Sequence, residues 1–465
     1  MKIFLLFTEI NQKFGPLYYQ HGLASISAML KENDFRSVSL IHFTREPDLV
    51  KWEAYLDEQK PDLIGIYSTA EQFYFIKRLI SKVPEGIFTI CGGPHPTCYP
   101  TCIEEIPRLD ALCIGEGEYP VLELARALKE GKDHSKIKNL WVRKGDDIIR
   151  NETRPFIADL DGLPPEDREL FDYQGSIDKY GLGQVRVMTT RGCPYQCTYC
   201  ANKRISKSQP GCYFRFRSAM HIMDELRYLD KEYKFNEIFF DDDIFMIDKK
   251  IRKEFCKRYR REIGKPFIFC GHIDTCNEEM LKELKGAGGR RIDFGLESGN
   301  EELRQKILKR NMTNNKIIET TNMAKRIGFQ IKTLNMVGLP EETIERHLDT
   351  VDLNSKIKPD VASIFVFYPY PGTELYDYCI HKAYFDPDEP LPRGYVSRRS
   401  SLLNLQYFSR NDIARCFQRF GFRVFKDFSL IKAIGYALIY SKYGEFLMRV
   451  TVRLRNIIVK LLPGF

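Results

Sequence analysis

The chain has 465 residues, of which 43% are hydrophobic and thirteen are cysteines. This length and composition are typical of two or three globular domains and exclude a disordered or low-complexity protein. The formal net charge is +8; residues 386–465 contain fourteen lysines and arginines against six acidic residues, so the first 385 residues are neutral overall. An odd number of cysteines without a signal peptide does not suit a disulfide-bonded protein, so we expect a reducing, cytoplasmic compartment.

Short apolar runs alternate with amphipathic stretches along the first 130 residues. The pattern predicts strands at residues 2–7, 37–42, 62–67, 86–91 and 110–115, and helices at 22–31, 48–58, 71–83 and 119–129. Buried strands separated by helices form a parallel sheet that is covered on both faces. We therefore expect an α/β domain with a Rossmann-like sheet over residues 1–150.

Small and polar residues follow several of these strands. Ligands of parallel sheets bind at the carboxyl ends of the strands, where the sequence places two loops and one polar pair. The candidate binding residues are Ser68 and Thr69, Gly92, Gly93 and His95 of CGGPHPT, and Gly115 and Glu116 of GEGE. The glycine pair allows a backbone to lie close to a flat ligand, although such a pair is about as often only a tight turn.

A second strand-helix unit follows a connecting region. Residues 139–150 predict a hairpin that turns at Gly145, and residues 151–184, which include the proline-punctuated stretch 161–172, are expected to form a linker. Strand-like runs then recur at 185–190, 237–240, 267–270, 292–295, 331–337 and 361–367. Six such units predict an open, partial (βα)6 TIM-like barrel over residues 185–384.

The carboxyl ends of barrel strands usually hold the functional residues. The residues at these ends are Asp241, Asp242 and Asp243 after the second strand, Glu297 and Ser298 after the fourth, and Gly338 after the fifth. Three consecutive aspartates are often only a solvated turn. At a barrel mouth their mutual repulsion favours a binding role.

The stretch VMTTRGCPYQCTYCAN, residues 187–202, places Cys193, Cys197 and Cys200 in one short loop behind a predicted strand. A C-x3-C-x2-C loop can supply three of the four ligands of a four-iron cluster and leaves one iron open to another ligand. Zinc is the alternative, but structural zinc sites usually pair two close cysteine knuckles, and no second knuckle lies nearby.

At these residues the sequence resembles the radical S-adenosylmethionine (SAM) superfamily. The resemblance implies that the open iron chelates the amino and carboxylate groups of SAM, that one electron cleaves SAM to a 5'-deoxyadenosyl radical, and that Tyr199 lies beside the adenine. It also implies that FFDDD, GLESG and MVGLPEE are the strand ends that bind SAM. YPYPGT, at 368–373, is similar to a loop that closes the site near the substrate.

A strand-helix domain with GGPHPT and GEGE ahead of the cysteine loop resembles the cobalamin-binding subclass of radical SAM enzymes. The similarity implies cobalamin on the strand ends as a third cofactor. The first loop lacks the D-x-H-x-x-G element that gives cobalt a histidine in cobalamin mutases, and His21 has no such frame. We therefore expect a non-histidine side chain or water below the cobalt.

The resemblance implies a radical SAM methyltransferase that acts on an unactivated carbon of a small or lipid-like substrate, with an external electron donor of the flavodoxin or ferredoxin type. No nucleic-acid partner is expected. A radical cyclase or oxidase that uses cobalamin without methyl transfer is one alternative. The other is a methylthiotransferase, which carries a second cluster; four cysteines precede the loop, Cys91, Cys98, Cys102 and Cys113.

Residues 385–465 are expected to form a basic helical region. Six apolar residues between 447 and 461 share one helical stripe, and the basic residues lie off it. Such helices most often pack onto their own protein, while a peripheral contact with an anionic membrane is the alternative.

Overall fold

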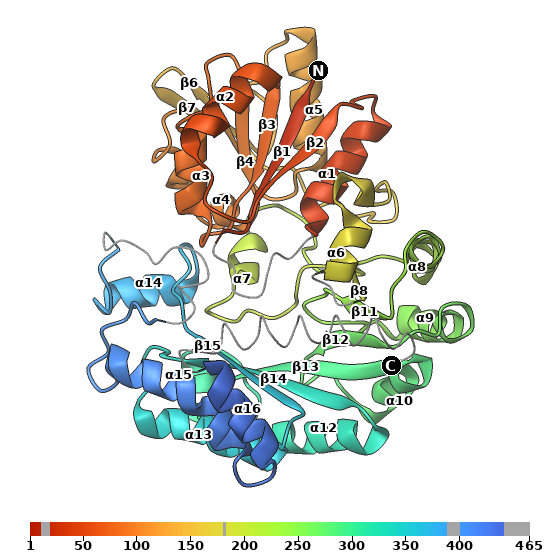
Figure 1. The fold of residues 1–465 in the computed structure, drawn as a ribbon, viewed down its shortest axis with the longest axis vertical. Coiled ribbons are helices and arrows are strands. Elements are labelled where there is room, and N and C mark those ends of the chain that lie inside the picture. Colours follow the sequence, from red (N-terminus) through yellow and green to blue (C-terminus); the bar gives the residue numbers. More distant parts are fainter. Residues whose placement is uncertain (11–18, 180–182, 388–399, 441–465) are drawn as a thin grey trace.

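A computed structural model describes residues 1–10, 19–179, 183–387 and 400–440. It contains two sheet-based units, one above the other in Figure 1, with the cysteine loop and a short helix, α7 (Ala201–Ile205), between them. The α/β class predicted from the sequence is confirmed, as are the Rossmann-like sheet, the partial barrel and a helical C-terminal region.

The first unit is a seven-stranded sheet in the order β2-β1-β3-β4-β5-β6-β7. Its first five strands are parallel, and β6 and β7 form the antiparallel hairpin predicted about Gly145. The strands are β1 (Ile3–Thr8), β2 (Val38–Phe43), β3 (Leu63–Tyr67), β4 (Phe88–Gly92), β5 (Ala111–Cys113), β6 (Leu140–Lys144) and β7 (Asp147–Arg150). The helices are α1 (His21–Glu32), α2 (Leu49–Gln59), α3 (Phe73–Ile80), α4 (Pro94–Cys98) and α5 (Glu118–Glu130).

Helix α5 shows why these segments fold locally. It buries Val121, Leu122, Leu124 and Ala125, whose spacing places them on one side of a helix. It ends at Gly131, which adopts φ +65° and donates its backbone N–H back into the last turn. The apolar side of α5 packs with α1 against one face of the sheet, so both helices stand over the carboxyl edge where the candidate residues lie.

The second unit is a parallel sheet of six strands in the order β15-β14-β13-β12-β11-β8. Sequential neighbours pair along the whole sheet, as in a barrel, and its two edge strands are β8 and β15. The strands are β8 (Gln184–Val187), β11 (Glu237–Phe240), β12 (Phe267–Gly271), β13 (Gly289–Glu297), β14 (Gln330–Val337) and β15 (Val361–Val366). The helices are α8 (Ala219–Glu232), α9 (Lys249–Glu262), α10 (Glu278–Ala287), α11 (Glu301–Lys306), α12 (Asn314–Ile327) and α13 (Ile344–Ile357).

The region between the two sheets is more structured than an extended connector. It contains a 3-10 turn at Arg168–Leu170 and helix α6 (Tyr173–Lys179), and the Arg168 side chain is 1% exposed. Arg168 forms ion pairs with Glu166 and Glu225 and a 2.7 Å hydrogen bond to the Tyr173 hydroxyl. Glu225 lies in α8 and Glu166 also pairs with His21 of α1, so these buried charges fix the connecting region against both units.

Helix α14 (Glu374–His381) follows the last barrel strand, and the C-terminal region contains α15 (Arg410–Phe425) and α16 (Leu430–Tyr440), drawn in blue in Figure 1. Helix α15 buries seven residues and packs against α13, β14 and β15, so this part lies on its own barrel. The stripe predicted between residues 447 and 461 lies outside the described residues. Among the described residues, no helix has both the length and the apolar character needed to span a membrane.

Candidate functional site

The three cysteines lie between β9 (Thr190–Arg191) and α7. Cys197 is buried, Cys193 and Cys200 are half-buried, and Pro194 and Gln196 between them are exposed. Thr198 secures the loop, because its hydroxyl donates to the Ile307 carbonyl at 2.6 Å and its carbonyl accepts from the Leu375 N–H at 2.9 Å. The loop is therefore anchored on its inner side and reaches the surface on its outer side.

A buried arginine that the sequence analysis did not single out lies beside this loop. Arg310 directs one guanidinium nitrogen at the Cys197 sulfur, 3.3 Å away, and at the Tyr199 hydroxyl, 3.4 Å away. Its other terminal nitrogen donates to the Gly295 carbonyl at 2.6 Å. The positive charge suits a thiolate or a carboxylate of a bound ligand.

Glu297 faces the same space from the end of β13. The Tyr199 hydroxyl bonds to its carboxylate, and burial raises the pKa of Glu297 although Arg310 opposes the shift. Its backbone has φ +65°, a conformation that costs a non-glycine residue of order 1–3 kcal/mol and is common at functional sites. Glu297, Tyr199 and Arg310 thus form one polar group beside the cysteine loop.

The three consecutive aspartates point in different directions. Asp241 forms an ion pair with Arg186 and accepts from His21 Nε2 at 3.1 Å. Asp242 is buried and accepts from the Thr189 N–H and hydroxyl, both at 3.0 Å; burial raises its pKa to about 7. Only Asp243 is directed to the segment after the cysteines, where it accepts from the Asn202 amide at 2.8 Å.

Ser298 and Gly338 occupy the ends of β13 and β14. Ser298 is buried, and its hydroxyl accepts from the Asn300 N–H. Gly338 adopts φ +79°, and its N–H donates at 2.6 Å to Glu342, whose carboxylate also accepts from the Leu339 N–H. Glu342 therefore fixes the Gly-Leu-Pro turn from below.

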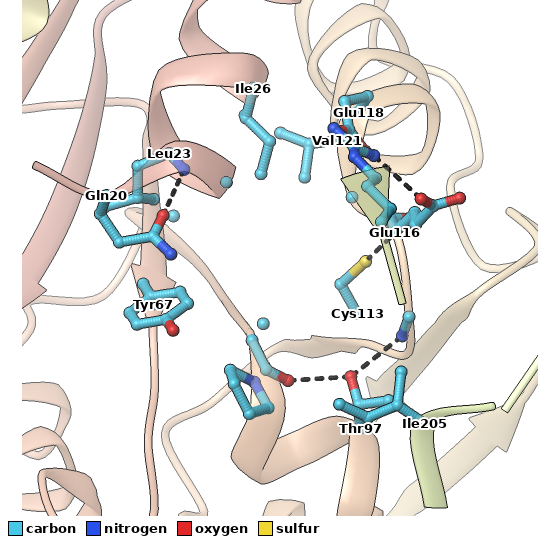
Figure 2. Close-up of a pocket in the computed structure, with 18 of the residues that line it drawn as sticks. Gln20, Leu23, Ile26, Tyr67, Thr97, Cys113, Glu116, Glu118, Val121 and Ile205 are labelled. Carbon is cyan, nitrogen blue, oxygen red and sulfur yellow. Dashed lines mark hydrogen bonds and ion pairs between the residues drawn. The ribbon is translucent and has the colours of Figure 1, made fainter. Parts of the chain in front are cut away.

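A cavity of about 320 Å³ opens at the carboxyl edge of the first sheet (Figure 2). Its floor is glycine-rich, and Leu23, Ile26 and Val121 of α1 and α5 cover its apolar side. Gln20 and Tyr67 form part of its wall, and Cys113 reaches it from β5. The floor glycines are Gly65, Gly92, Gly93, Gly115 and Gly117.

Close approach explains two of these glycines. Gly93 has φ +103°, and a Cβ there would lie 2.9 Å from the Ser68 carbonyl oxygen; a Cβ on Gly117 would meet Ile26 at 3.0 Å. The Thr97 hydroxyl joins the two predicted loops, because it donates to the Gly93 carbonyl at 2.8 Å and accepts from the Gly115 N–H at 3.0 Å (Figure 2). The two loops thus form one side of the cavity, which we call the slot.

Not every predicted residue lines this slot. Gly92, Gly93, Gly115 and Glu116 do. Ser68 and Thr69 do not; the backbone of Ser68 instead bonds to Gly92 and His95. His95 packs on Phe73 with ring centroids 4.2 Å apart, and burial lowers its pKa to about 4.

His21 is held away from the cavity by carboxylates on both sides. Its Nδ1 lies 2.9 Å from Glu166 and its Nε2 lies 3.1 Å from Asp241. Although burial opposes it, these carboxylates raise the pKa of His21 to about 9, so the imidazole is cationic at neutral pH. In the described part of the chain, no histidine lines the cavity.

The cavity and the cysteine loop share a wall. Arg191 and Gly192, which immediately precede Cys193, line the cavity opposite the first sheet, together with Tyr213 and Arg215. A ligand in the slot therefore lies directly behind the strand that leads into the cysteine loop.

The positions of the cysteines bear on which metal centre they can bind. Among the described residues, no three His, Cys, Asp or Glu side chains converge on a single metal ion. The cysteines of a four-iron cluster bind different irons and need not converge. Cys91 and Cys102 are buried in the apolar core on one face of the first sheet, while Cys113 lies on the opposite face, which disfavours a second cluster there.

The residues of these two sites suit an iron-sulfur cluster and a second, separate cofactor. The Radical SAM superfamily model matches residues 187–353, and that of the B12 binding domain matches residues 9–125. The "uncharacterized methyltransferase PH0819" of Pyrococcus horikoshii is 30% identical over 396 residues, 82% of this chain and 83% of the relative. The chain belongs to the radical SAM enzymes that carry a B12-binding domain, and its cofactors are a four-iron cluster, SAM and cobalamin.

Two further similarities bear on fold and activity. The anaerobic magnesium-protoporphyrin IX monomethyl ester cyclase of Rubrivivax gelatinosus is 25% identical over 329 residues, 68% of this chain and 58% of the relative. The solved structure of the radical SAM methyltransferase TsrM from Kitasatospora setae, with tryptophan and a SAM analogue, superimposes with a TM-score of 0.69. That match covers 98% of this chain and 100% of TsrM at 15% identity, so it shows a shared fold.

Proposed function

We propose that the protein transfers a methyl group to an unactivated carbon of a small organic substrate. The observation that carries the proposal is the shared wall, because Arg191 and Gly192 belong both to the slot and to the strand that enters the cysteine loop. When bound, cobalamin supplies the methyl group and SAM on the cluster supplies the radical that removes hydrogen. Methylation needs these two functions close to one substrate, and the two sites adjoin each other at this wall.

The side chains divide into two groups in this proposal. Cys193, Cys197 and Cys200 bind three irons of the cluster. Tyr199, Glu297, Asp243, Gly338 and the newly identified Arg310 surround the SAM site, where Arg310 neutralises negative charge and Glu297 accepts hydrogen bonds.

Asp241 and Asp242 instead support this site from outside, through Arg186 and the two threonines at 189 and 190. Ser298 positions the end of β13.

The glycines at 92, 93 and 115 form the cobalamin slot, and Glu116 holds its edge. Ser68 and His95 support the loops from behind, and Thr69 lies outside the slot. The bounds of residues 1–150, 151–184, 185–384 and 385–465 remain our proposed division into domains.

Product analysis tests the methyltransferase proposal. Anaerobically reconstituted protein, incubated with SAM, a reductant and candidate substrates, should form S-adenosylhomocysteine and 5'-deoxyadenosine in roughly equal amounts, because methyl supply and hydrogen abstraction each use one SAM. The product should gain the mass of a methyl group less one hydrogen. Formation of 5'-deoxyadenosine alone, with a product that has lost hydrogen, would favour the cyclase activity that one relative's name gives.

An acidic flavodoxin or ferredoxin is our proposed electron donor. The exposed Pro194 and Gln196 bring the cysteine loop to the surface, and Arg204 and Lys207 are exposed close behind it. Reversing both charges, R204E with K207E, should slow cluster reduction by flavodoxin and leave reduction by dithionite unchanged. Equal slowing with both reductants would mean damage to the loop and would contradict the docking proposal.

Peripheral membrane contact, with a lipid-like substrate, is a separate proposal supported by α16. Its residues Leu430, Ile431, Ile434 and Leu438 form one stripe and are 49–88% exposed. Intact protein should co-sediment with anionic vesicles at low salt and less so at high salt, and I431S with L438S should weaken this binding. No sedimentation at low salt, or equal binding by the variant, would contradict it.

A further inference from the structure

The GEGE loop of the first unit is tied to the strand that enters the cysteine loop. Arg191 donates at 2.9 Å to Glu116 and at 2.6 Å to Glu118, so one guanidinium bridges both carboxylates of the motif. Ser25 of α1 donates to Glu118 at 2.8 Å and also lies 3.4 Å from Arg191. Figure 2 places Glu116 and Glu118 together at one side of the slot.

Glu116 also bonds to the second unit and to the connecting region. Its carboxylate accepts from Arg215 at 3.0 Å and from the Ile157 N–H at 2.7 Å, and its own N–H donates to the Gln209 amide at 2.9 Å. Arg191 and Arg215 are paired residues on β9 and β10 (Arg215–Phe216), a two-stranded ribbon. The loop is thereby fixed to the ribbon through side chains and backbone.

Rigid backbone completes the connection from Arg191 to the first cysteine. Gly192 has φ +89°, and a Cβ there would lie only 2.4 Å from the Tyr213 carbonyl oxygen. Between Arg191 and Cys193 the backbone is thus in close contact with the segment around Tyr213. A single tightly packed residue, Gly192, thus separates Arg191 from Cys193.

The charges are buried enough for this contact to have a preferred geometry. The side chains of Arg191, Glu116 and Glu118 are 20%, 13% and 4% exposed. A buried pair that loses one partner leaves an uncompensated charge, which strongly opposes alternative arrangements of the loop. The cavity lies between the parts that this contact joins, since Gly115, Glu116, Gly117 and Arg191 all line it.

We propose that Arg191 is a positioning residue that couples the two metallocofactor sites. A corrinoid in the slot holds the GEGE loop in the position that orders the cysteine loop. In the other direction, an assembled cluster tightens corrinoid binding. The coupling is reciprocal because it is a difference in binding free energy. The proposal requires that both cofactors bind, but it does not require methyl transfer. Its failure and that of the proposed function are therefore distinguishable.

The test measures binding of hydroxocobalamin by equilibrium dialysis against the whole chain under anaerobic conditions, with cobalt counted by mass spectrometry. Wild-type protein with its cluster is compared with the same chain carrying C193A, C197A and C200A. We expect the cluster-loaded protein to bind at least about fivefold more tightly, the lower end of typical couplings. In R191Q the cluster should change the affinity less than about twofold, which is below that range.

The matched control is R290Q, because Arg290 pairs with Glu237 at the amino ends of the barrel strands, away from both sites. It should keep the full wild-type coupling. R191K, which retains the charge, should restore part of it. A second readout is the electron paramagnetic resonance spectrum of the reduced cluster, which should change on cobalamin addition in wild type and not in R191Q.

R191Q leaves Glu118 with Ser25 as its remaining side-chain partner and can unfold the loop. The double variant R191Q with E118Q removes both charges and keeps hydrogen-bonding groups, so the same loss of coupling is expected in a charge-balanced background. Equal hydroxocobalamin affinity with and without cluster in wild type would overturn the proposal. So would full coupling in the double variant.

Discussion

Replacement of Gly192 by alanine tests the rigidity of the cluster loop. Gly192 has φ +89°, and an added Cβ would lie 2.4 Å from the Tyr213 carbonyl oxygen, whereas ordinary contact begins at 3.4 Å. The obstructing atom is a backbone oxygen in the segment that leads into β10, and it cannot rotate away as a side chain would. The two strands must therefore separate by about 1 Å immediately before Cys193.

The magnitude follows from two terms. The first is backbone strain, because alanine at a positive φ costs of order 1 kcal/mol. The second is the separation of the two segments, which exceeds the roughly 0.5 Å that functional sites tolerate. The first term alone changes global stability slightly. The second term moves Cys193 relative to the other two cysteines that bind the cluster. We therefore expect cluster occupancy in G192A to fall at least tenfold, which corresponds to about 1.4 kcal/mol.

The assay is iron and sulfide content after anaerobic reconstitution, with the spectrum of the reduced cluster as confirmation. G145A is the control, because Gly145 has φ +63° and a Cβ added there would meet no atom within 4 Å. It shares the backbone strain but not the contact, and should load four irons normally. If G192A also loaded four irons with a wild-type spectrum, the reasoning from close packing would be wrong.

Three further predictions concern the cysteines, cobalt and pH. Any single alanine replacement of the three loop cysteines should abolish 5'-deoxyadenosine formation, measured by chromatography, and persistent product would contradict their assignment. Reconstituted protein in the Co(II) state should give an electron paramagnetic resonance spectrum without nitrogen superhyperfine splitting, because no described histidine lines the slot; splitting would indicate a nitrogen ligand. Burial raises the pKa of Glu342 from 4.5 to about 8. Between these two pH values the folded chain keeps the proton and the unfolded chain has lost it. The free energy of unfolding therefore falls as the pH rises, by about 1.4 kcal/mol per pH unit. E342Q lacks this titration and should gain stability relative to wild type from about pH 5.5 to 7.5 in urea unfolding, within the window set by the two pKa values; parallel pH profiles would refute the shift.

Most of the fold could be predicted because each strand is a short apolar run bounded by turn residues. The expected strand at 237–240 coincides with β11, and the hairpin about Gly145 forms as expected. Local periodicity determines such elements, since each run must bury its side chains in one sheet. The slot glycines could be found because close packing leaves a local signature, such as a glycine pair after a strand.

The contacts between side chains that lie far apart in the sequence had no comparable signature. Arg310 lies 113 residues from Cys197 in sequence, and His21 lies 220 residues from Asp241. A single buried arginine or histidine resembles any surface residue until the fold brings its partner close. Glu116 shows the same limit: its place at the slot was predictable from the strand end, but its two arginine partners were not.

The resemblance assigned all three consecutive aspartates to SAM binding, and their contacts in the structure distinguish between them. The trio follows the end of β11, and its three side chains have different partners. Asp242 points inward and bonds to the threonines at 189 and 190, while Asp241 points to Arg186 and His21. We therefore propose Asp243, which accepts from Asn202, as the member of the trio that contacts a molecule bound at the cysteine loop. Its two neighbours instead hold the end of β11 to β8, β9 and α1.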